Sequence, residues 1–313
     1  MTLKIEKNVS LKNFSTFKIG GKAKYFCKVK KREDLFEILK WAKKKKIPFF
    51  ILGGGSNVLF SDKGFKGLVI KIEFQNFKFL NSKLFAEAGC PLMKLVLESV
   101  KRGKKGLEWA AGIPGTLGGA IVGNAGAFGK EMKDVVEKVE VLKIKKNKIE
   151  ILNFQNKDCQ FGYRESKFKR EKDLLLLSAT LKLKKGKKKI LEKKIKEILK
   201  KRKEKYPLSF PSAGCIFKNV PLKNVPKKFQ EVFKDKIQKK PILNLPAAIF
   251  IEKANLKGLK IGRAQVSKKH ANFIVNLGEA KAKDVLELIK KIKKKVKEKF
   301  KVELEEEIIL VGF

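Results

Sequence analysis

Two glycine-dense stretches carry the residues of this sequence that could bind an extended anionic ligand. Residues 112–129 read GIPGTLGGAIVGNAGAFG, in which seven of eighteen residues are glycine. Residues 53–57, GGGSN, follow directly on the apolar run PFFIL at 48–52. A strand that ends in a glycine turn offers successive backbone N–H groups to an anion, in practice a diphosphate. We therefore predict that both stretches form a backbone cradle for a ligand.

Other structures for these stretches are a flexible linker and a simple hairpin turn. A linker would be polar throughout, whereas residues 112–129 interleave Ile113, Leu117 and Ile121 with the glycines. The spacing also differs from the Gly-x-Gly-x-x-Gly turn of a Rossmann fold, so the usual dinucleotide fingerprint is absent. A ligand contact is the favoured interpretation of residues 112–129, and a hairpin turn stays open for residues 53–57.

The elements that must position these stretches follow from apolar periodicity. Apolar residues at helical spacing predict helices with one buried face, and short apolar or alternating runs predict strands. The predicted helices span residues 32–46, 92–102, 184–205 and 282–300, and the predicted strands span residues 48–52, 84–89, 136–144, 148–154, 173–183 and 302–312. Pro207 and Pro211 mark a boundary, after which the chain reads as a smaller α+β domain.

Length and composition are those of a soluble globular protein of two or three domains. The chain has 313 residues, of which 43% are hydrophobic and 35% charged. No apolar run approaches the roughly 18 residues that span a membrane, and residues 1–14 lack the apolar segment of a secretory signal. We therefore expect a cytoplasmic protein. The widely separated Cys27, Cys90, Cys159 and Cys215 form no CxxC pair, so we expect neither a disulfide framework nor a metal site.

The formal net charge of +44 raises the possibility of a nucleic acid or an anionic membrane surface as partner. Only six of the 76 basic residues are arginine, although base reading and bidentate phosphate contacts favour the guanidinium group. The lysines are also spread along the whole chain. We therefore interpret the charge as solvated surface lysine, with no specific nucleic acid partner and no membrane insertion. A noncatalytic polyanion-binding protein stays as the alternative from a different class.

Six motifs occur in order along the chain: GGGSN at 53–57, AGIPGTLGGAIVGNAGAFG at 111–129, FGYRES at 161–166, PSAGCIFKN at 211–219, SKKHANFIVN at 267–276 and LEEEI at 304–308. Together they resemble the UDP-N-acetylenolpyruvoylglucosamine reductase family over nearly the whole chain. The resemblance implies an α+β fold, with a two-lobed FAD-binding domain of the vanillyl-alcohol-oxidase (PCMH) type and a C-terminal α+β substrate-binding domain. The implied boundaries are 1–75 and 76–205 for the two FAD-binding lobes and 206–313 for the substrate-binding domain.

The spacing of two motifs is similar to that of the shorter branch of this family. Arg164 and Cys215 are 51 positions apart. This separation leaves no room for the extra tyrosine-bearing segment that is found in one branch.

The resemblance also implies a reaction and its cofactors. NADPH would reduce bound FAD, and flavin N5 would then deliver hydride to UDP-N-acetylglucosamine enolpyruvate, giving UDP-N-acetylmuramate for peptidoglycan synthesis. We expect a monomer. Thr116 lies where the family places a hydroxyl beside the flavin ring. The implied cofactor-binding residues are Gly53, Gly54, Gly55, Ser56, Asn57, Gly112, Ile113, Pro114, Gly115, Thr116, Gly118, Gly119, Asn124, Ala125 and Gly126.

Three residues match the catalytic positions of the family. Hydride addition pushes negative charge onto the enolpyruvyl carboxylate, so a fixed cation and a hydrogen-bonding acid are needed nearby. Arg164 is similar to the carboxylate-binding arginine, Glu307 to the catalytic glutamate, and Cys215 lies where many members carry a proton-donating serine. A thiol is more acidic than an alcohol and can protonate an enolate if it is itself protonated at rest. In a regular strand Glu305 and Glu307 share a face, so periodicity leaves both open and the family pattern selects Glu307.

Four further residues match positions that contact the nucleotide sugar in the family: Tyr163, Lys205, Asn219 and His270. His270 is the only histidine of the chain, and a purely structural role for it stays open. Another FAD oxidoreductase or an oxidase of the same flavin fold is the alternative within enzymes. It would explain the glycine stretches but not the three catalytic positions together.

Overall fold

The computed structural model describes residues 3–144, 149–240 and 242–313. The chain divides into two compact units. The first contains Met1–Lys7, Tyr25–Gly54 and Gly67–Arg202, and the second contains Asn8–Lys24, Gly55–Lys66 and Lys203–Phe313. Each unit has a hydrophobic core of its own. The boundaries at residues 75 and 205 that the sequence predicts for three domains stay a prediction.

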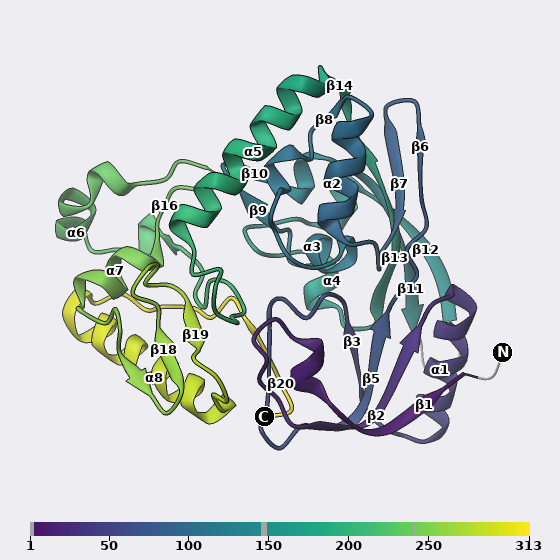
Figure 1. Cartoon of the computed structure of the whole chain (residues 1–313), viewed down its shortest axis with the longest axis horizontal. Helices are drawn as coiled ribbons and strands as arrows, with labels where there is room; N and C mark the ends of the chain where they lie inside the picture. Colours follow the sequence, from purple (N-terminus) through teal and green to yellow (C-terminus); the bar gives the residue numbers. More distant parts are fainter. Residues whose placement is uncertain (1–2, 145–148, 241) are drawn as a thin grey trace. The chain divides into compact units, whose positions relative to one another are not determined.

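A four-stranded sheet brings together the N-terminal strands (Figure 1). Its order is β1 (Ile5–Ser10), β2 (Lys22–Val29), β5 (Phe65–Ile72) and β3 (Phe49–Leu52). β3 runs parallel to β5. Helix α1 (Arg32–Lys44) buries Leu35, Ile38, Leu39 and Ala42, the face expected from a period of 3.6 residues. Because β3 ends at Leu52, this sheet positions the start of the glycine stretch at residues 53–57.

A five-stranded antiparallel sheet forms the second lobe of the first unit. Its order is β12 (Ile149–Gln155), β11 (Val136–Ile144), β13 (Leu174–Lys182), β7 (Lys83–Glu87) and β6 (Phe77–Leu80). Central strand β13 is buried up to Leu181; β11 and β7 pair with its two edges, and α3 (Leu117–Val122) packs against it (Figure 1). The other elements around this lobe are α2 (Leu92–Lys101), α4 (Lys167–Arg170), α5 (Lys188–Lys205), β8 (Lys104–Lys105), β9 (Gly126–Ala127), β10 (Lys130–Glu131) and β14 (Lys184–Lys185).

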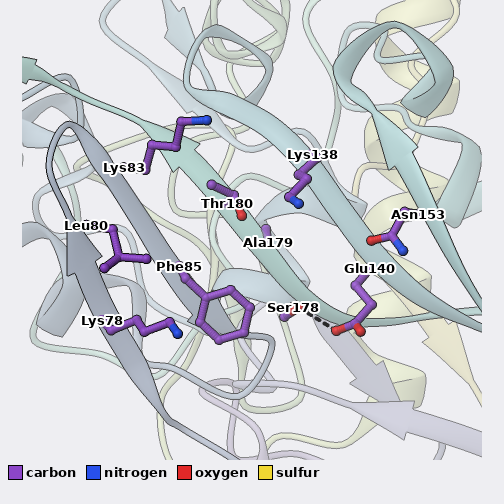
Figure 2. Close-up of a pocket in the computed structure, with 10 residues that line it drawn as sticks. All are labelled: Lys78, Leu80, Lys83, Phe85, Lys138, Glu140, Asn153, Ser178, Ala179 and Thr180. Atoms are coloured by element: carbon purple, nitrogen blue, oxygen red, sulfur yellow. Dashed lines mark hydrogen bonds between the residues drawn. The ribbon is translucent and has the colours of Figure 1, made fainter.

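Polar side chains of this sheet line a cavity of about 340 Å³, shown in Figure 2. Arg32 donates to Glu140 Oε2 at 2.6 Å and to Glu87 Oε1 at 3.3 Å, and Ser178 Oγ donates to Glu140 Oε2 at 2.8 Å. None of the predicted site residues lines the cavity. Three of its ten lining residues are lysine, close to the share of basic residues in the chain, 76 of 313, so its composition does not mark an anion site.

The second unit packs helix α8 (Ala282–Phe300) against a three-stranded sheet of β17 (Lys260–Ile261), β18 (Ala264–Val266) and β19 (Ile274–Asn276) (Figure 1). α8 buries Val285, Leu288 and Ile292, and Asp284 accepts a hydrogen bond from the Lys281 N–H at 3.0 Å at its start. β4 (Val58–Phe60) pairs in parallel with β20 (Ile309–Val311). The other elements are β15 (Val220–Pro221), β16 (Asn244–Leu245), α6 (Lys227–Val232) and α7 (Ala247–Lys253).

Short 3-10 helices complete the described elements. They span Leu11–Phe14, Glu108–Ala110, Met132–Asp134, Asn156–Cys159, Leu222–Asn224 and Lys234–Lys236. No helix within residues 3–144, 149–240 and 242–313 is long and apolar enough to cross a membrane.

Periodicity predicted most of the long elements correctly. The helix expected at 282–300 coincides with α8, and the strands expected at 136–144 and 148–154 correspond to β11 and β12, which pair in antiparallel fashion; Lys148 lies outside the described residues. The terminal strand expected at 302–312 is wrong for most of its length, because only Ile309–Val311 form a strand. The pairing partner changes along this segment: Glu306 bridges Phe217 in antiparallel fashion, whereas β20 pairs in parallel with β4, so no continuous ladder forms.

Candidate active site

The two glycine-dense stretches contact each other within the first unit. A Cβ on Gly54 would overlap the Cα of Gly115, and a Cβ on Gly53 would lie 2.7 Å from Oγ1 of Thr116. Lys71 Nζ donates a hydrogen bond to the Gly53 carbonyl. A side chain at either glycine would force the backbones apart, so close approach explains why these positions lack one.

Backbone hydrogen bonds hold residues 115–117 against the start of α2. The Leu92 N–H donates to the Gly115 carbonyl at 3.0 Å, and the Leu117 N–H donates to the Cys90 carbonyl at 2.9 Å. Both bonds belong to ordered backbone beside the second sheet. The stretch is therefore a fixed surface and not a linker.

No protein atom lies closely over the Cβ position of Gly119, in helix α3, or of Gly123, just after it. The N-cap of α3 is Thr116, whose Oγ1 accepts from the Gly119 N–H at 3.4 Å. Gly119 is exposed, and a Cβ there would meet only Thr116 Oγ1, at 3.7 Å, within 4 Å. A Cβ on Gly123 would meet only the Gly119 carbonyl, at 3.6 Å. Packing therefore gives no reason for glycine at 119 and 123, and bare backbone facing open space fits a cofactor that lies directly on it.

Two buried polar side chains fasten the FGYRES loop to the glycine-rich stretch. Asn124 is 0% exposed; its Nδ2 donates to the Gly162 carbonyl at 2.7 Å, and its Oδ1 accepts from the Lys133 N–H at 3.0 Å. Ser166, also buried, donates to the Val122 carbonyl at 2.7 Å. Because the Asn124 side chain is enclosed and hydrogen-bonded within the protein, any cofactor contact of this residue falls to its backbone.

Arg164 has a left-handed backbone and a guanidinium group held by its surroundings. Its φ is +56°, in the left-handed region that only a small minority of non-glycine residues adopt. Nη2 donates to the Gly126 carbonyl at 3.0 Å, and the guanidinium carbon lies 5.2 Å from the centre of the Tyr163 ring. The structure therefore brings Tyr163, Arg164 and the end of the glycine-rich stretch together.

The rest of the cofactor set predicted for this unit lies in the same stretch: Gly112, Ile113, Pro114, Gly118, Ala125 and Gly126. The Gly112 N–H contacts the Met93 sulfur at 3.4 Å, and a Cβ at this position would lie 2.8 Å from Arg202 Cδ. A Cβ on Gly118 would lie 2.9 Å from that of Ala88. Protein packing thus explains glycine at positions 112 and 118.

In the second unit, the end of GGGSN is tied to the backbone around Glu307. Gly55 has a φ of +66°, and Ser56 is half-buried. Asn57 Nδ2 donates to the Glu307 carbonyl at 3.1 Å, and the Asn57 carbonyl accepts from the Ile309 N–H at 3.0 Å. Asn57 therefore supports the segment that carries the predicted catalytic glutamate.

Cys215 and Glu307 lie on neighbouring hydrogen-bonded segments. Cys215 bridges Phe273 in antiparallel fashion, and the Ile216 carbonyl accepts from the Glu307 N–H at 2.7 Å. Cys215 is half-buried. Gly214, just before it, has a φ of +81° and open space around its Cβ position. The thiol thus follows a turn that favours glycine, beside space that the protein does not fill.

The three consecutive glutamates have different surroundings. Glu305 has a side chain that is 71% exposed and pairs with Lys218 Nζ at 2.5 Å. Glu306 pairs with Lys293 Nζ at 2.8 Å. Glu307 is half-buried, and its N–H is the group that bonds to the Cys215 segment. Strand alternation left Glu305 and Glu307 open, and burial distinguishes them.

His270 is enclosed by aromatic rings and is neutral near pH 7. Its ring centre lies 5.3 Å from that of Tyr206 and 5.0 Å from that of Phe273. Burial, and secondly the charge of Lys205, lowers the pKa of His270 from 6.5 to about 4. Nδ1 accepts from the Asn272 N–H at 3.3 Å, so Nε2 carries the hydrogen and can donate.

The other predicted substrate residues of this unit lie on two elements. Lys205 is the last residue of α5, is exposed, and has its Nζ 5.9 Å from the centre of the Tyr206 ring. Asn219 is half-buried and donates to Gln238 Oε1 at 3.3 Å. Tyr206 thus gathers Lys205 and His270, and Asn219 contacts a different segment.

Tyr206 and Asn272 shape this part of the site and were missed by the sequence reasoning. Asn272 lies within the SKKHANFIVN motif, and Tyr206 directly follows Lys205. Their closeness in sequence to predicted substrate residues could therefore have marked them as candidates. Their partners come from distant segments, which local patterns do not identify.

Comparisons with known proteins identify the family and the cofactor-binding domain of the chain. The family described as UDP-N-acetylenolpyruvoylglucosamine reductase, C-terminal domain, matches residues 206–311, and the FAD binding domain family matches residues 23–152. A UDP-N-acetylenolpyruvoylglucosamine reductase of Caldanaerobacter subterraneus subsp. tengcongensis is 43% identical over 99% of this chain and 94% of that protein. One from Caldicellulosiruptor bescii is 43% identical over 98% and 90%. The crystal structure of UDP-N-acetylenolpyruvylglucosamine reductase from Thermus caldophilus has a TM-score of 0.76 at 33% identity, covering 99% of this chain and 100% of that one.

Fold and matches together define an FAD-dependent oxidoreductase with an FAD-binding domain that contains two sheets and with a C-terminal α+β domain, which confirms the predicted α+β class. The PCMH type of the FAD-binding domain stays a prediction. The chain belongs to the UDP-N-acetylenolpyruvoylglucosamine reductase family.

Proposed function

We propose that the chain reduces UDP-N-acetylglucosamine enolpyruvate to UDP-N-acetylmuramate with NADPH as reductant and FAD as cofactor, within peptidoglycan precursor synthesis. The observation that carries the proposal is the hydrogen bond between the Glu307 N–H and the Ile216 carbonyl, because it joins the segment of a proton donor to the segment of a carboxylate. The choice of NADPH over NADH, a monomeric state and a cytoplasmic location stay predictions.

We assign the cofactor to the backbone of residues 53–57 and 112–126. When bound, FAD would supply hydride-transfer chemistry between NADPH and the methylene carbon of the enolpyruvyl group. Open backbone at Gly119 and Gly123 and the fixed contact of Gly54 with Gly115 support this assignment. The Thr116 hydroxyl accepts one hydrogen bond as N-cap and keeps its own hydrogen for the cofactor.

The catalytic roles follow from charge and acidity. Arg164 binds the substrate carboxylate and stabilises the charge that develops there. Cys215 gives the Sγ proton to the carbon next to the carboxylate, so that hydride and proton together saturate the double bond. The thiolate left behind takes its proton back from water. Glu307 is the hydrogen-bonding acid beside this step, and its burial favours it over the exposed, ion-paired Glu305.

Binding of the nucleotide sugar falls to four side chains of different chemistry. Lys205 offers a positive charge, the neutral His270 offers its Nε2 hydrogen, and Asn219 and Tyr163 offer an amide and a phenol. Because two aromatic rings enclose His270, its ring orientation is fixed. This supports a role as a hydrogen-bond donor in a fixed direction, and not as a mobile positive charge.

The visible spectrum of the purified chain tests this function. Bound flavin is yellow. Under anaerobic conditions NADPH should bleach the yellow colour, and UDP-N-acetylglucosamine enolpyruvate should then restore it. Recovery with oxygen alone, and none with the enolpyruvyl sugar, would indicate an oxidase. A colourless protein that binds polyanions would support the noncatalytic alternative.

A further inference from the structure

We infer that Asn272 is a positioning residue for the reduction of the sugar: it holds the Cys215 segment and His270 in one rigid frame. This inference rests on the proposed function, in which Cys215 donates the proton. Asn272 touches neither reacting group through its side chain, so its effect is on their orientation.

The side chain of Asn272 binds the backbone two residues beyond Cys215. Its Oδ1 accepts from the Phe217 N–H at 2.9 Å, and its Nδ2 donates to the Phe217 carbonyl at 2.8 Å. Asn272 is 3% exposed and Phe217 is 0% exposed, so water does not compete for these bonds. A primary amide has the same donor and acceptor as a peptide group, and here it continues the pairing as a strand would.

The backbone of Asn272 connects the same segment to His270. Its carbonyl accepts from the Ile216 N–H at 2.8 Å, and its N–H donates to His270 Nδ1 at 3.3 Å. The next residue, Phe273, bridges Cys215. One residue therefore fixes the course of the Cys215 segment and the ring orientation of His270.

The same frame reaches the catalytic glutamate. The Ile216 carbonyl accepts from the Glu307 N–H, while the Ile216 N–H donates to Asn272. Residues 215–217 thus lie between the segment of Asn272 and the segment of Glu307. On the Asn272 side, the bonds to Phe217 come from the Asn272 side chain. Without the Asn272 amide, the Phe217 N–H and carbonyl lose their partners and the segment is free to shift relative to Glu307.

Asn276 offers a matched control in the same motif. It is also 3% exposed, its Nδ2 donates to the Phe17 carbonyl at 3.0 Å, and its Oδ1 accepts from the Gly278 and Ala280 N–H groups at 2.9 and 3.0 Å. These partners lie away from residues 215–217 in the chain. Asn276→Ala therefore removes a comparable set of buried hydrogen bonds without touching the frame of Cys215.

The test compares the two half-reactions in FAD-loaded Asn272→Ala, Asn276→Ala and Cys215→Ala. Stopped-flow absorbance measures flavin reduction by NADPH and, separately, reoxidation by saturating UDP-N-acetylglucosamine enolpyruvate without oxygen. We expect Asn272→Ala to reduce flavin at the wild-type rate and to reoxidise it roughly 10- to 100-fold more slowly, since small misplacements of reacting groups cost about that much. Asn276→Ala should keep both rates even though its melting temperature falls.

A conservative variant separates positioning from folding. In Asn272→Asp the carboxylate still accepts from the Phe217 N–H but cannot donate to the carbonyl. A buried carboxyl has a raised pKa, and once protonated it regains a donor. Relative to wild type at the same pH, reoxidation by Asn272→Asp should therefore recover as the pH falls.

The outcomes distinguish the inference from the proposed function. Wild-type reoxidation in Asn272→Ala together with a large loss in Cys215→Ala overturns only the positioning role. A wild-type rate in Cys215→Ala removes Cys215 as proton donor and the inference with it. If Asn272→Ala fails to fold, a wild-type rate in Asn272→Asp at every pH overturns the positioning role instead.

Discussion

His270 couples the stability of the fold to pH through a single protonation. Its pKa falls from 6.5 to about 4 on folding, first because burial disfavours the imidazolium ion and secondly because Lys205 is positively charged. Between these pH values the unfolded chain binds a proton that the folded chain does not. At about 1.4 kcal/mol per pKa unit, the neutral ring contributes roughly 3 kcal/mol, present above pH 6.5 and lost as the pH falls towards 4.

The assay is simplified because the chain contains one histidine. In tag-free protein, the imidazole signals in an NMR titration belong to His270 alone, and we expect their midpoint near 4. Urea unfolding at pH 7.5 and 4.5 gives the stability change for wild type and for His270→Gln. The carboxyl groups are the same in both proteins, so their contribution cancels when the two losses are subtracted. Between pH 7.5 and 4.5 the free energy of unfolding should fall by about 2 to 3 kcal/mol more in wild type than in His270→Gln.

A histidine midpoint near 6.5 would refute the reasoning, as would equal losses of stability in wild type and His270→Gln. Lys205→Ala provides a second check. Removing this positive charge should raise the pKa of His270 while the ring stays buried. An unchanged midpoint would show that burial acts alone.

Three other substitutions test the first unit and the thiol. Cys215→Ala should keep FAD reduction by NADPH and lose reoxidation by the enolpyruvyl sugar, and near wild-type single-turnover reoxidation would remove its proton-donor role. Thr116→Val should lower the stability by about 1 kcal/mol because the helix cap is lost, and it should shift the flavin reduction potential. If the potential and the rate of hydride transfer stay unchanged, the hydroxyl has no role beside the flavin, and only the backbone of this stretch would bind the cofactor. Asn124→Ala leaves the Gly162 carbonyl and the Lys133 N–H unpaired, so the free energy of unfolding in urea should fall by about 2 to 4 kcal/mol. A fall below roughly 0.5 kcal/mol, the range of surface substitutions, would show that Asn124 does not hold the FGYRES loop in place.

Local patterns predicted the elements whose structure depends on their own residues. The apolar spacing of α8 sets one buried face at a period of 3.6, and the structure has that helix at the predicted residues. Gly54 was recognised as special because its neighbours are glycines after a strand. Its partner, Gly115, was predicted only as part of the same ligand cradle, and the direct contact between the two follows from the fold.

The C-terminal glutamates mark where local patterns stop being sufficient. Alternation assumed a regular strand, whereas this segment pairs first with Phe217 and then with β4, so its faces do not alternate with one partner. Burial, and with it the difference between Glu305 and Glu307, depends on this change of partner.

By itself, the sequence determined the family, the cofactor class, most of the long helices and strands, and the glycine stretches, because each of these depends on neighbouring residues or on ordered motifs. The tertiary structure alone decided that Asn124 and Asn272 act through their partners and that Cys215 and Glu307 share a hydrogen-bonded frame. A buried amide gains its role from the backbone groups that it satisfies, and the farthest of those groups lie 38 positions from Asn124 and 55 positions from Asn272 in the chain.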